Sequence, residues 1–314
     1  MSDSITETEP RTLGTSPAPI TAAPMMAAPI TAAPITAAPI TAAPVRAPQT
    51  ASALTLQNLR ALLTGETLVL HISGFRHPDD AQQLTQKMID HAQFERYFRA
   101  PDIGVQRTGM TFFETNGSDD LLLRYYEEAL LGTRTLRQVC SPRLSPVDQL
   151  RLELGDLWLE GLRNENAHGR PMLAGIGRVF ENGFELPPHQ DILARDLRDA
   201  TQPPLANHQP LLRQFSANIY LRPAAQGGEL EIWDFTPSFQ EQEGLRDREF
   251  QYEGIIARTA LPAPTVVIDP QPGDLILFDS SCIHAVRASQ GGPRVSMSLF
   301  IGYRGPNQPL TYWN

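Results

Sequence analysis

Apolar residues in the first half of the chain recur at helical spacing. The pattern predicts amphipathic helices over residues 79–98, 119–136 and 145–162, the last of them opening with a Ser-Pro pair that suits a helix N-cap and first turn. A short apolar run at 68–72 predicts a strand ahead of them. We assign these elements to a helical part that spans residues 55–165.

After Arg170 the pattern changes to short apolar segments separated by Asn-Gly, Gly-Gly and Pro-Gly turns. The segments lie at 172–180, 184–188, 216–222, 229–235, 255–268, 274–278, 285–288 and 295–303. Eight short strands with turn signals are typical of a jelly roll rather than a parallel α/β sheet. We therefore predict an α+β fold, a cupin-like double-stranded β-helix with its β core at 171–303 and a flanking N-terminal helical layer.

Residues 18–48 repeat a five-residue Ala-Pro-Ile-Thr-Ala unit. Proline at this period removes backbone donors and opposes both helix and sheet. We expect residues 1–50 to be a disordered tail and residues 51–314 to be the folded domain. A partner-docking segment is the alternative interpretation of the repeat.

Composition narrows the class of protein. The chain of 314 residues has a formal net charge of −9 and no cluster of Lys and Arg, which disfavours a nucleic-acid or anionic-membrane partner. Cys140 and Cys282 fit no zinc or disulfide pattern, and no apolar run approaches the length of a membrane span. The start of the chain lacks the features of a signal peptide. We expect a soluble cytoplasmic protein that acts on a small molecule, and its oligomeric state stays open.

Three residues have the spacing of a metal site. His189 and Asp191 are two positions apart, and in a strand such residues point to the same face. His284 opens a later predicted strand and supplies a second imidazole. Two His and one carboxylate on one face of Fe(II) leave coordination positions open for a co-substrate and O₂. The His-x-Asp pair arises often by chance, so it needs further support.

Arg294, ten residues after His284, gives that support. A turn between the last two strands would place it near the metal, where its planar fork can bind a carboxylate with two hydrogen bonds. Ser296, two residues on, shares its face and can donate a third. We predict that both bind the distal carboxylate of 2-oxoglutarate. The alternative is that Arg294 caps a hairpin at the surface.

The order of His189, Asp191, the GGEL segment at 227–230, the PGDLILF segment at 272–278, His284 and Arg294 resembles the 2-oxoglutarate/iron(II) oxygenase superfamily. The second half of the chain is similar to the carrier-independent aliphatic halogenases and hydroxylases. That group chlorinates hapalindole-type alkaloids and includes hydroxylases of free or N-acyl amino acids. The resemblance extends over most of residues 55–314 and implies the metal ligands and the 2-oxoglutarate anchor named above.

The resemblance also implies an activity. The halogenases have a small residue where this chain has Asp191, and chloride fills the vacated position, so a carboxylate there implies hydroxylation. We expect a dioxygenase that uses Fe(II), 2-oxoglutarate and O₂, with ascorbate as a further reductant. It would hydroxylate an unactivated C–H bond of an amino acid, an amino-acid derivative or a natural product of secondary metabolism, and release succinate and CO₂.

Other residues are candidates for ligand contacts. On a strand that faces the same cavity, Asn218 and Tyr220 are expected to contact the co-substrate. Arg178 and Arg287 could bind a substrate carboxylate, although a solvated charge is the simpler interpretation of each. The charged segment 240–254 is a candidate lid.

Two further classes of protein stay open at this point. A non-catalytic cupin-like protein that binds a metal or ligand would share the β architecture but would have no use for Arg294 and Ser296. A structural or interaction protein would use the repeat tail, with the β domain as a scaffold. Within the enzyme class, desaturation or ring formation would need the same residues as hydroxylation.

Overall fold

Two β-sheets that share an apolar cluster form the centre of the protein, in a computed structural model that describes residues 46–314 except 93, 251 and 253. The large sheet has the strand order β1 (Gln49–Ala51), β2 (Val69–Ile72), β12 (Leu275–Asp279), β8 (Arg213–Arg222), β15 (Arg294–Tyr303), β6 (Ile176–Phe180), β4 (Val105–Arg107) and β3 (Glu95–Arg96), and β16 (Leu310–Trp313) and β5 (Leu162–Asn164) extend from β15. The small sheet has the order β11 (Val266–Ile268), β10 (Leu230–Ile232), β13 (His284–Val286) and β7 (Leu186–His189), and β9 (Gln226–Gly227) pairs with β14 (Ser289–Gln290). Neighbouring strands of the small sheet are antiparallel, as are the central ones of the large sheet, which confirms the predicted jelly roll.

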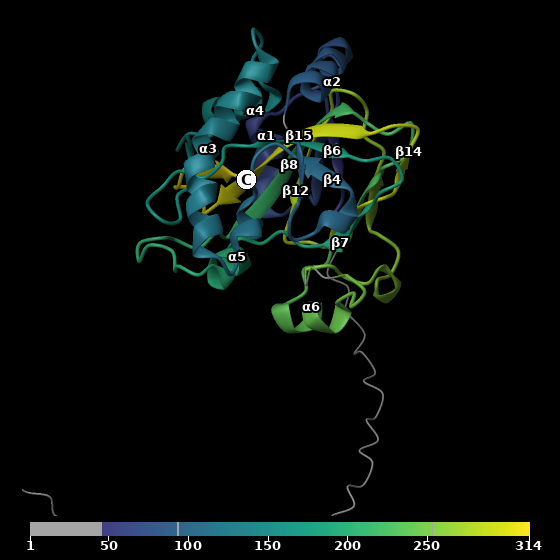
Figure 1. The fold of residues 1–314 in the computed structure, drawn as a ribbon. Coiled ribbons are helices and arrows are strands. Elements are labelled where there is room, and N and C mark those ends of the chain that lie inside the picture. Colours follow the sequence, from purple (N-terminus) through teal and green to yellow (C-terminus); the bar gives the residue numbers. More distant parts are fainter. Residues whose placement is uncertain (1–45, 93, 251, 253) are drawn as a thin grey trace, which may run out of the picture. The chain divides into compact units, whose positions relative to one another are not determined.

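Helices cover the outer face of the large sheet (Figure 1). They are α1 (Leu56–Thr64), α2 (Pro78–His91), α3 (Asp119–Cys140) and α4 (Pro146–Leu157), and α5 (Leu193–Asp199) and α6 (Phe239–Leu245) lie in later loops. Each of the first four begins at a residue whose side chain accepts a hydrogen bond from the first turn, such as Ser118 for α3. Their apolar faces pack on the outward residues of β8 and β15, which leaves the inward residues of these strands to line the interior of the barrel.

Several predicted boundaries are wrong, among them the end of the helix predicted at 119–136, which continues to Cys140 as α3. α2 ends at His91 instead of residue 98, because the chain turns there into β3. α4 ends at Leu157, and the last predicted helical residue, Leu162, begins β5. The predicted strand 255–268 is a 3₁₀ turn at Arg258–Ala260 followed by β11, since the prolines at 262 and 264 lack the amide hydrogen that a strand ladder requires.

The folded domain begins earlier than the sequence predicted. Residues 1–45 of the predicted tail lie outside the described residues, but 46–50 pack on the domain, which corrects the boundary at 50/51. β1 pairs in parallel with β2. The Nε atom of Arg46 donates to Asp234 at 2.8 Å, and its guanidinium lies 3.6 Å from Asp279. The sequence did not predict this start of the domain, because β1 pairs only at the edge of a sheet and Arg46 pairs with residues far away in sequence.

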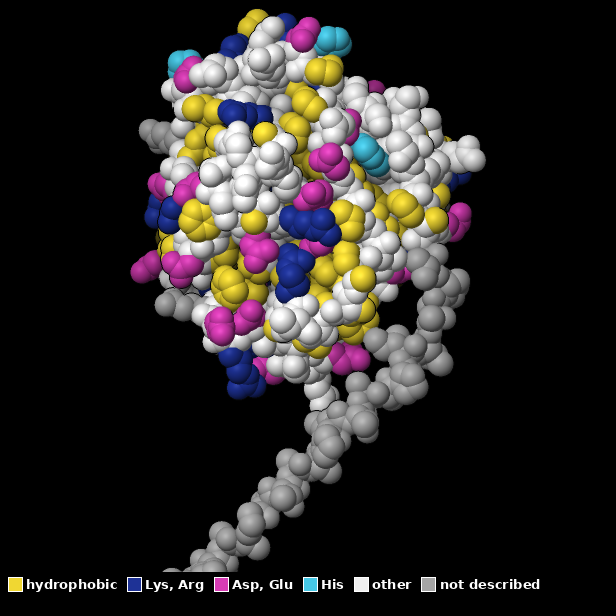
Figure 2. Space-filling model, turned by 90° about the vertical axis from the view of Figure 1, so that its right-hand side faces the viewer, with side chains coloured by type: hydrophobic (Ala, Val, Ile, Leu, Met, Phe, Trp, Pro, Cys, Tyr) yellow, Lys and Arg dark blue, Asp and Glu magenta, His cyan; other side chains and the backbone are white. Residues whose placement is uncertain are grey.

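The surface carries mixed charge. On the face in Figure 2, Lys and Arg side chains are interspersed with Asp and Glu, so this face has no extended basic area. Among the helices of the described residues, none combines the length and apolar character that a membrane crossing requires.

Candidate active site

Two adjacent strands of the small sheet bring His189 and His284 together. His189 ends β7, His284 begins β13, and the two are directly paired across the antiparallel ladder, with ring centroids 4.3 Å apart. Asp191 was predicted to follow His189 in the same strand, but β7 ends at His189. The amide of Asp191 instead donates to the carbonyl of Ser280 at 3.0 Å, and this bond turns its carboxylate toward the two imidazoles.

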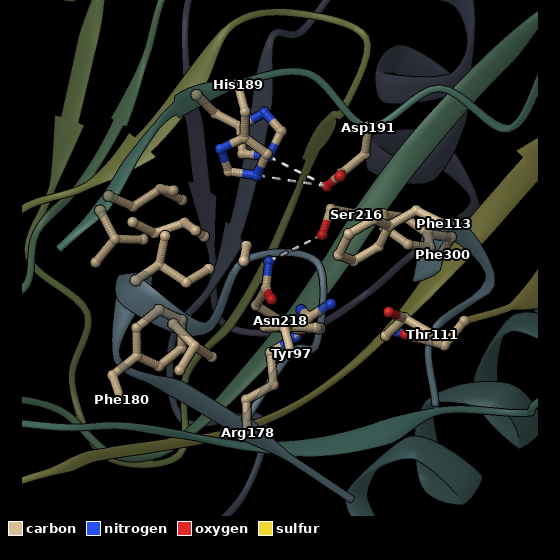
Figure 3. Close-up of a pocket in the computed structure, with 18 of the residues that line it drawn as sticks. Tyr97, Thr111, Phe113, Arg178, Phe180, His189, Asp191, Ser216, Asn218 and Phe300 are labelled. Carbon is tan, nitrogen blue, oxygen red and sulfur yellow. Dashed lines mark hydrogen bonds and ion pairs between the residues drawn. The ribbon is translucent and has the colours of Figure 1, made fainter. Parts of the chain in front are cut away.

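Side-chain geometry gives the three residues the form of a metal site (Figure 3). Oδ2 of Asp191 lies 3.3 Å from Nε2 of His284 and 3.9 Å from Nε2 of His189, and one donor atom from each residue lies within 4.8 Å of the others. Each Nδ1 faces a backbone carbonyl, that of Pro187 for His189 and that of Cys282 for His284. Because a carbonyl only accepts, each Nδ1 carries the hydrogen and each Nε2 keeps its lone pair for a metal.

Electrostatics keep these groups in the protonation states that a metal requires. Burial, helped by the neighbouring His284, lowers the pKa of His189 to about 4. Burial alone would raise the pKa of Asp191, but the adjacent imidazoles of His284 and His189 bring that pKa below its usual range. A neutral imidazole and a charged carboxylate are the forms that bind a divalent ion.

A cavity extends from this cluster into the barrel, and Arg294 lies in its wall. Arg294 is 3% exposed, and its guanidinium packs 3.8 Å from the centre of the Phe180 ring and donates a hydrogen bond to the carbonyl of Gly228 at 3.1 Å. Its Nε has no partner, and no carboxylate pairs with it, among the described residues. Burial lowers the pKa of Arg294 to about 10, which is the mark of a desolvated cation without an anion. The interpretation of Arg294 as a surface hairpin residue is therefore wrong.

The inward face of β8 supplies further polar groups. Asn218 and Tyr220 line the cavity as predicted, and Nδ2 of Asn218 donates to Oγ of Ser216 at 3.1 Å. The ring of Tyr220 lies 5.5 Å from the Arg294 guanidinium. Ser296 is buried between Arg178 and Tyr220 in the sheet and is not among the cavity-lining residues in the described part of the chain. A direct role for Ser296 in ligand binding therefore has weaker support than one for Asn218 or Tyr220.

The two candidate substrate arginines have different environments. Arg178 lines the cavity, where its Nε donates to Tyr97 Oη at 2.9 Å and its Nη1 donates to Ser298 Oγ at 2.8 Å. The simpler interpretation of Arg178 as a solvated charge is thus wrong. Arg287 is exposed, and its Nε donates to Glu231 at 2.7 Å. The suggestion that Arg287 binds substrate is wrong, since an odd offset from His284 places it on the opposite face of the strand.

Sequence reasoning missed several cavity residues. Thr111 precedes the 3₁₀ helix Phe112–Thr115, Asn314 follows β16, and Asp196 lies on the short helix α5. Burial raises the pKa of Asp196 to about 7, in spite of Arg195 3.6 Å away. From the predicted lid segment, Tyr252 contributes a ring to the cavity wall and contacts Phe113. No local motif marks these residues in the sequence, because they meet through the fold alone.

Part of the chain matches a known protein family. Residues 175–302 match the family described as the 2OG-Fe(II) oxygenase superfamily. The chain is 26% identical over 155 residues to an L-isoleucine 3(1)-dioxygenase from Pantoea ananatis, an alignment that covers 46% of this chain and 48% of the relative. It is 25% identical over 197 residues to an L-gamma-glutamyl-L-propargylglycine hydroxylase from Streptantibioticus cattleyicolor, which covers 61% of this chain and 66% of the relative. The aligned part of the chain thus spans about half of the length of the first relative and about two thirds of the length of the second.

A solved structure shares the fold. The N-substituted L-amino acid dioxygenase from Burkholderia ambifaria AMMD superposes with a TM-score of 0.55 at 20% sequence identity, covering 82% of this chain and 91% of that one. At this identity the likeness shows the architecture and no more.

Proposed function

Because the chain belongs to the 2OG-Fe(II) oxygenase superfamily, we propose that it hydroxylates an unactivated C–H bond of a small molecule, with 2-oxoglutarate and O₂ as co-substrates and succinate and CO₂ as co-products. The substrate class is an amino acid or an amino-acid derivative. The similarity to an L-isoleucine 3(1)-dioxygenase and to an L-gamma-glutamyl-L-propargylglycine hydroxylase supports this choice. The similarity to halogenases stays a prediction, and Asp191 in the ligand set favours hydroxylation over chlorination.

One observation carries the proposal: the cavity that holds the His189, Asp191 and His284 cluster also contains a buried guanidinium that has no anionic partner among the described residues. A protein that only binds a metal gains nothing from burying an unpaired cation, which costs free energy. A co-substrate with a keto acid at one end and a carboxylate at the other satisfies both features. The arrangement therefore favours an oxygenase over a non-catalytic cupin-like protein.

The residues present fit both groups. His189, Asp191 and His284 would hold Fe(II), and Arg294, with Tyr220 beside it, would hold the distal carboxylate of 2-oxoglutarate. With 2-oxoglutarate and O₂, the bound metal supplies an oxidising power that no protein side chain offers. The carbonyls of Pro187 and Cys282 orient the imidazoles, and the aromatic walls exclude water from the reacting C–H bond.

A cytoplasmic location is part of the proposal. Cys140 and Cys282 are both buried and unpaired with each other, as is usual where thiols stay reduced. The small-molecule substrate fits the enclosed cavity, whose lining mixes aromatic, aliphatic and a few charged side chains.

Succinate release tests the proposed function. Purified protein with Fe(II), ascorbate and 2-oxoglutarate should form succinate slowly without a substrate and faster with one. The His284→Ala variant is the matched control and should form none. Equal succinate from both proteins would overturn the proposal.

A further inference from the structure

The turn 280–283 connects β12 to β13 and orients two of the three residues of the metal cluster. The carbonyl of Cys282 accepts a hydrogen bond from Nδ1 of His284 at 3.0 Å. The carbonyl of Ser280 accepts from the amide of Asp191 at 3.0 Å, and the hydroxyl of Ser280 donates to the carbonyl of Asp191 at 3.2 Å. A shift of this one turn would therefore move the imidazole and the carboxylate relative to each other.

Arg46 contacts both ends of the turn, although it lies 236 positions before Cys282 in the sequence. Its Nη2 donates to Sγ of Cys282 at 3.1 Å, and its Nη1 lies 3.6 Å from Oδ2 of Asp279, the last residue of β12. The other carboxylate oxygen of Asp279 accepts from the amide of Ser281 at 3.1 Å. Because a guanidinium holds several donors in one rigid plane, a single side chain can fix both ends of the turn.

Asp234, just after β10, holds Arg46 in this position. Nε and Nη2 of Arg46 donate to Oδ1 of Asp234 at 2.8 Å and 2.6 Å, and the main-chain amide of Arg46 donates to Oδ2 at 2.9 Å. The amide of Asp234 donates to Oγ1 of Thr265 at 2.9 Å. The side chain of Arg46 is only 20% exposed, so this charge-assisted pair is stronger than an ordinary surface ion pair. Arg46 thus joins the turn to a second, independent part of the β core.

We propose that Arg46 is a positioning residue for the metal site: it clamps the turn 280–283 to Asp234 and thereby fixes the directions of His284 and Asp191. The inference rests on the proposed function and adds to its metal site a residue that is not itself a metal ligand. Loss of a residue that orients metal ligands typically lowers metal affinity about tenfold to a hundredfold. The alternative is that Arg46 only attaches the start of the domain to the β core, in which case its loss would lower stability and leave metal affinity unchanged.

Metal affinity separates these two roles without any turnover. Metal-free, full-length protein is titrated with Co(II), and the visible absorption of the bound ion gives the dissociation constant. Arg46→Ala should bind Co(II) about tenfold to a hundredfold more weakly than wild type, and Arg46→Lys should recover part of this loss because one charged donor remains. The control is Thr55→Ala, which removes the N-cap of α1 and should lower the unfolding midpoint while keeping the wild-type affinity. Wild-type affinity in Arg46→Ala, or an equal loss in Thr55→Ala, would overturn the proposal.

A second variant tests whether the effect of Arg46 passes through the turn. Cys282→Ala removes the sulfur that Arg46 contacts and leaves the pair of Arg46 with Asp234 in place. If Arg46 acts through the turn, the double variant should lose less Co(II) affinity than the product of the two single losses, because each single substitution already breaks the same contact. Losses that multiply would mean that the two residues act independently and would overturn the proposal.

Amide hydrogen exchange in the metal-free protein distinguishes failure of this inference from failure of the proposed function. The amides of Cys282 and Asp191 donate to carbonyls of β12 and of the turn, and both should exchange about tenfold faster in Arg46→Ala but at the wild-type rate in Thr55→Ala. If wild-type protein binds no Co(II), the proposed function fails, while the exchange rates still decide whether Arg46 holds the turn. If wild-type protein binds Co(II) and Arg46→Ala matches it in affinity and exchange, only the inference fails.

Discussion

Replacing Arg294 with Met should damage co-substrate binding while leaving the fold as stable as before, or more so. The guanidinium is buried, its Nε has no partner among the described residues, and burial lowers its pKa to about 10, so its charge contributes no net stability. Met has similar length and can pack against the rings of Phe180 and Tyr220, which now contact the guanidinium. The substitution should therefore weaken the binding of 2-oxoglutarate without lowering the stability of the fold.

The expected loss of affinity follows from the interaction that Arg294 is proposed to make. Removing a charge-assisted, two-point contact with a carboxylate costs about 2–4 kcal/mol. At about 1.4 kcal/mol for each factor of ten, the KM for 2-oxoglutarate should rise roughly thirtyfold to a thousandfold. Arg294→Lys should recover part of the loss, because it keeps the charge but not the fork.

Two measurements decide this prediction. The first is substrate-free succinate formation at increasing 2-oxoglutarate concentration, and the second is the midpoint of thermal unfolding without co-substrate. Arg222→Met is the matched control, since Arg222 is an exposed arginine at the end of β8. An Arg294→Met protein with the wild-type KM for 2-oxoglutarate would refute the assignment. One that unfolds at a much lower temperature would show that Arg294 stabilises the fold.

Three other changes test separate parts of the structure. His284→Ala should lower Fe(II) affinity and abolish succinate formation without changing the circular dichroism spectrum, and normal succinate formation would exclude His284 as a ligand. Deleting residues 1–45 should leave the midpoint of thermal unfolding unchanged. Deleting residues 1–51 should lower it by about 2–6 °C, because this deletion removes β1 and the ion pair of Arg46 with Asp234. Equal midpoints for the two deletions would show that these contacts do not stabilise the fold. Burial raises the pKa of Asp196 from its ordinary value of 3.8 to about 7, so the carboxyl binds a proton more tightly in the folded protein than in the unfolded chain. The stability that this proton contributes is fully present below pH 4 and is lost as pH rises through 7. Asp196→Asn should therefore gain about 2–4 kcal/mol over wild type between pH 4 and pH 8 in denaturant unfolding of the metal-free protein, and a constant difference across this range would contradict the raised pKa.

The His189–Asp191 pair and the cavity position of Arg294 relative to His284 could be predicted because the spacing within each pair is short. His189 and Asp191 are two residues apart, and Arg294 follows His284 after one turn, so short segments carry the information. The reasoning about Asp191 was still incomplete, since its carboxylate is directed by the bond of its amide to Ser280 and not by strand alternation. Sequence periodicity also predicted the existence of α2 and α4 but not their ends, because helix termination here depends on tertiary pairing in β3 and β5.

The cavity residues outside the metal motif could not be predicted, because they meet only through the fold. Arg178 reaches the cavity from β6, and Thr111 reaches it from a segment far from β6 in sequence. Neither residue is near a motif, so nothing local distinguishes it from an ordinary surface residue. Among the described residues, the acidic side chains of the cavity wall are Asp191 and Asp196, and the pKa of Asp196 is about 7. While Asp196 is protonated, Arg178, Arg294 and a divalent ion outweigh Asp191 and a dianionic co-substrate by one unit of positive charge, which a substrate carboxylate would cancel. Once Asp196 is ionised the charges balance, so the preference for an anionic substrate should weaken as pH rises through 7.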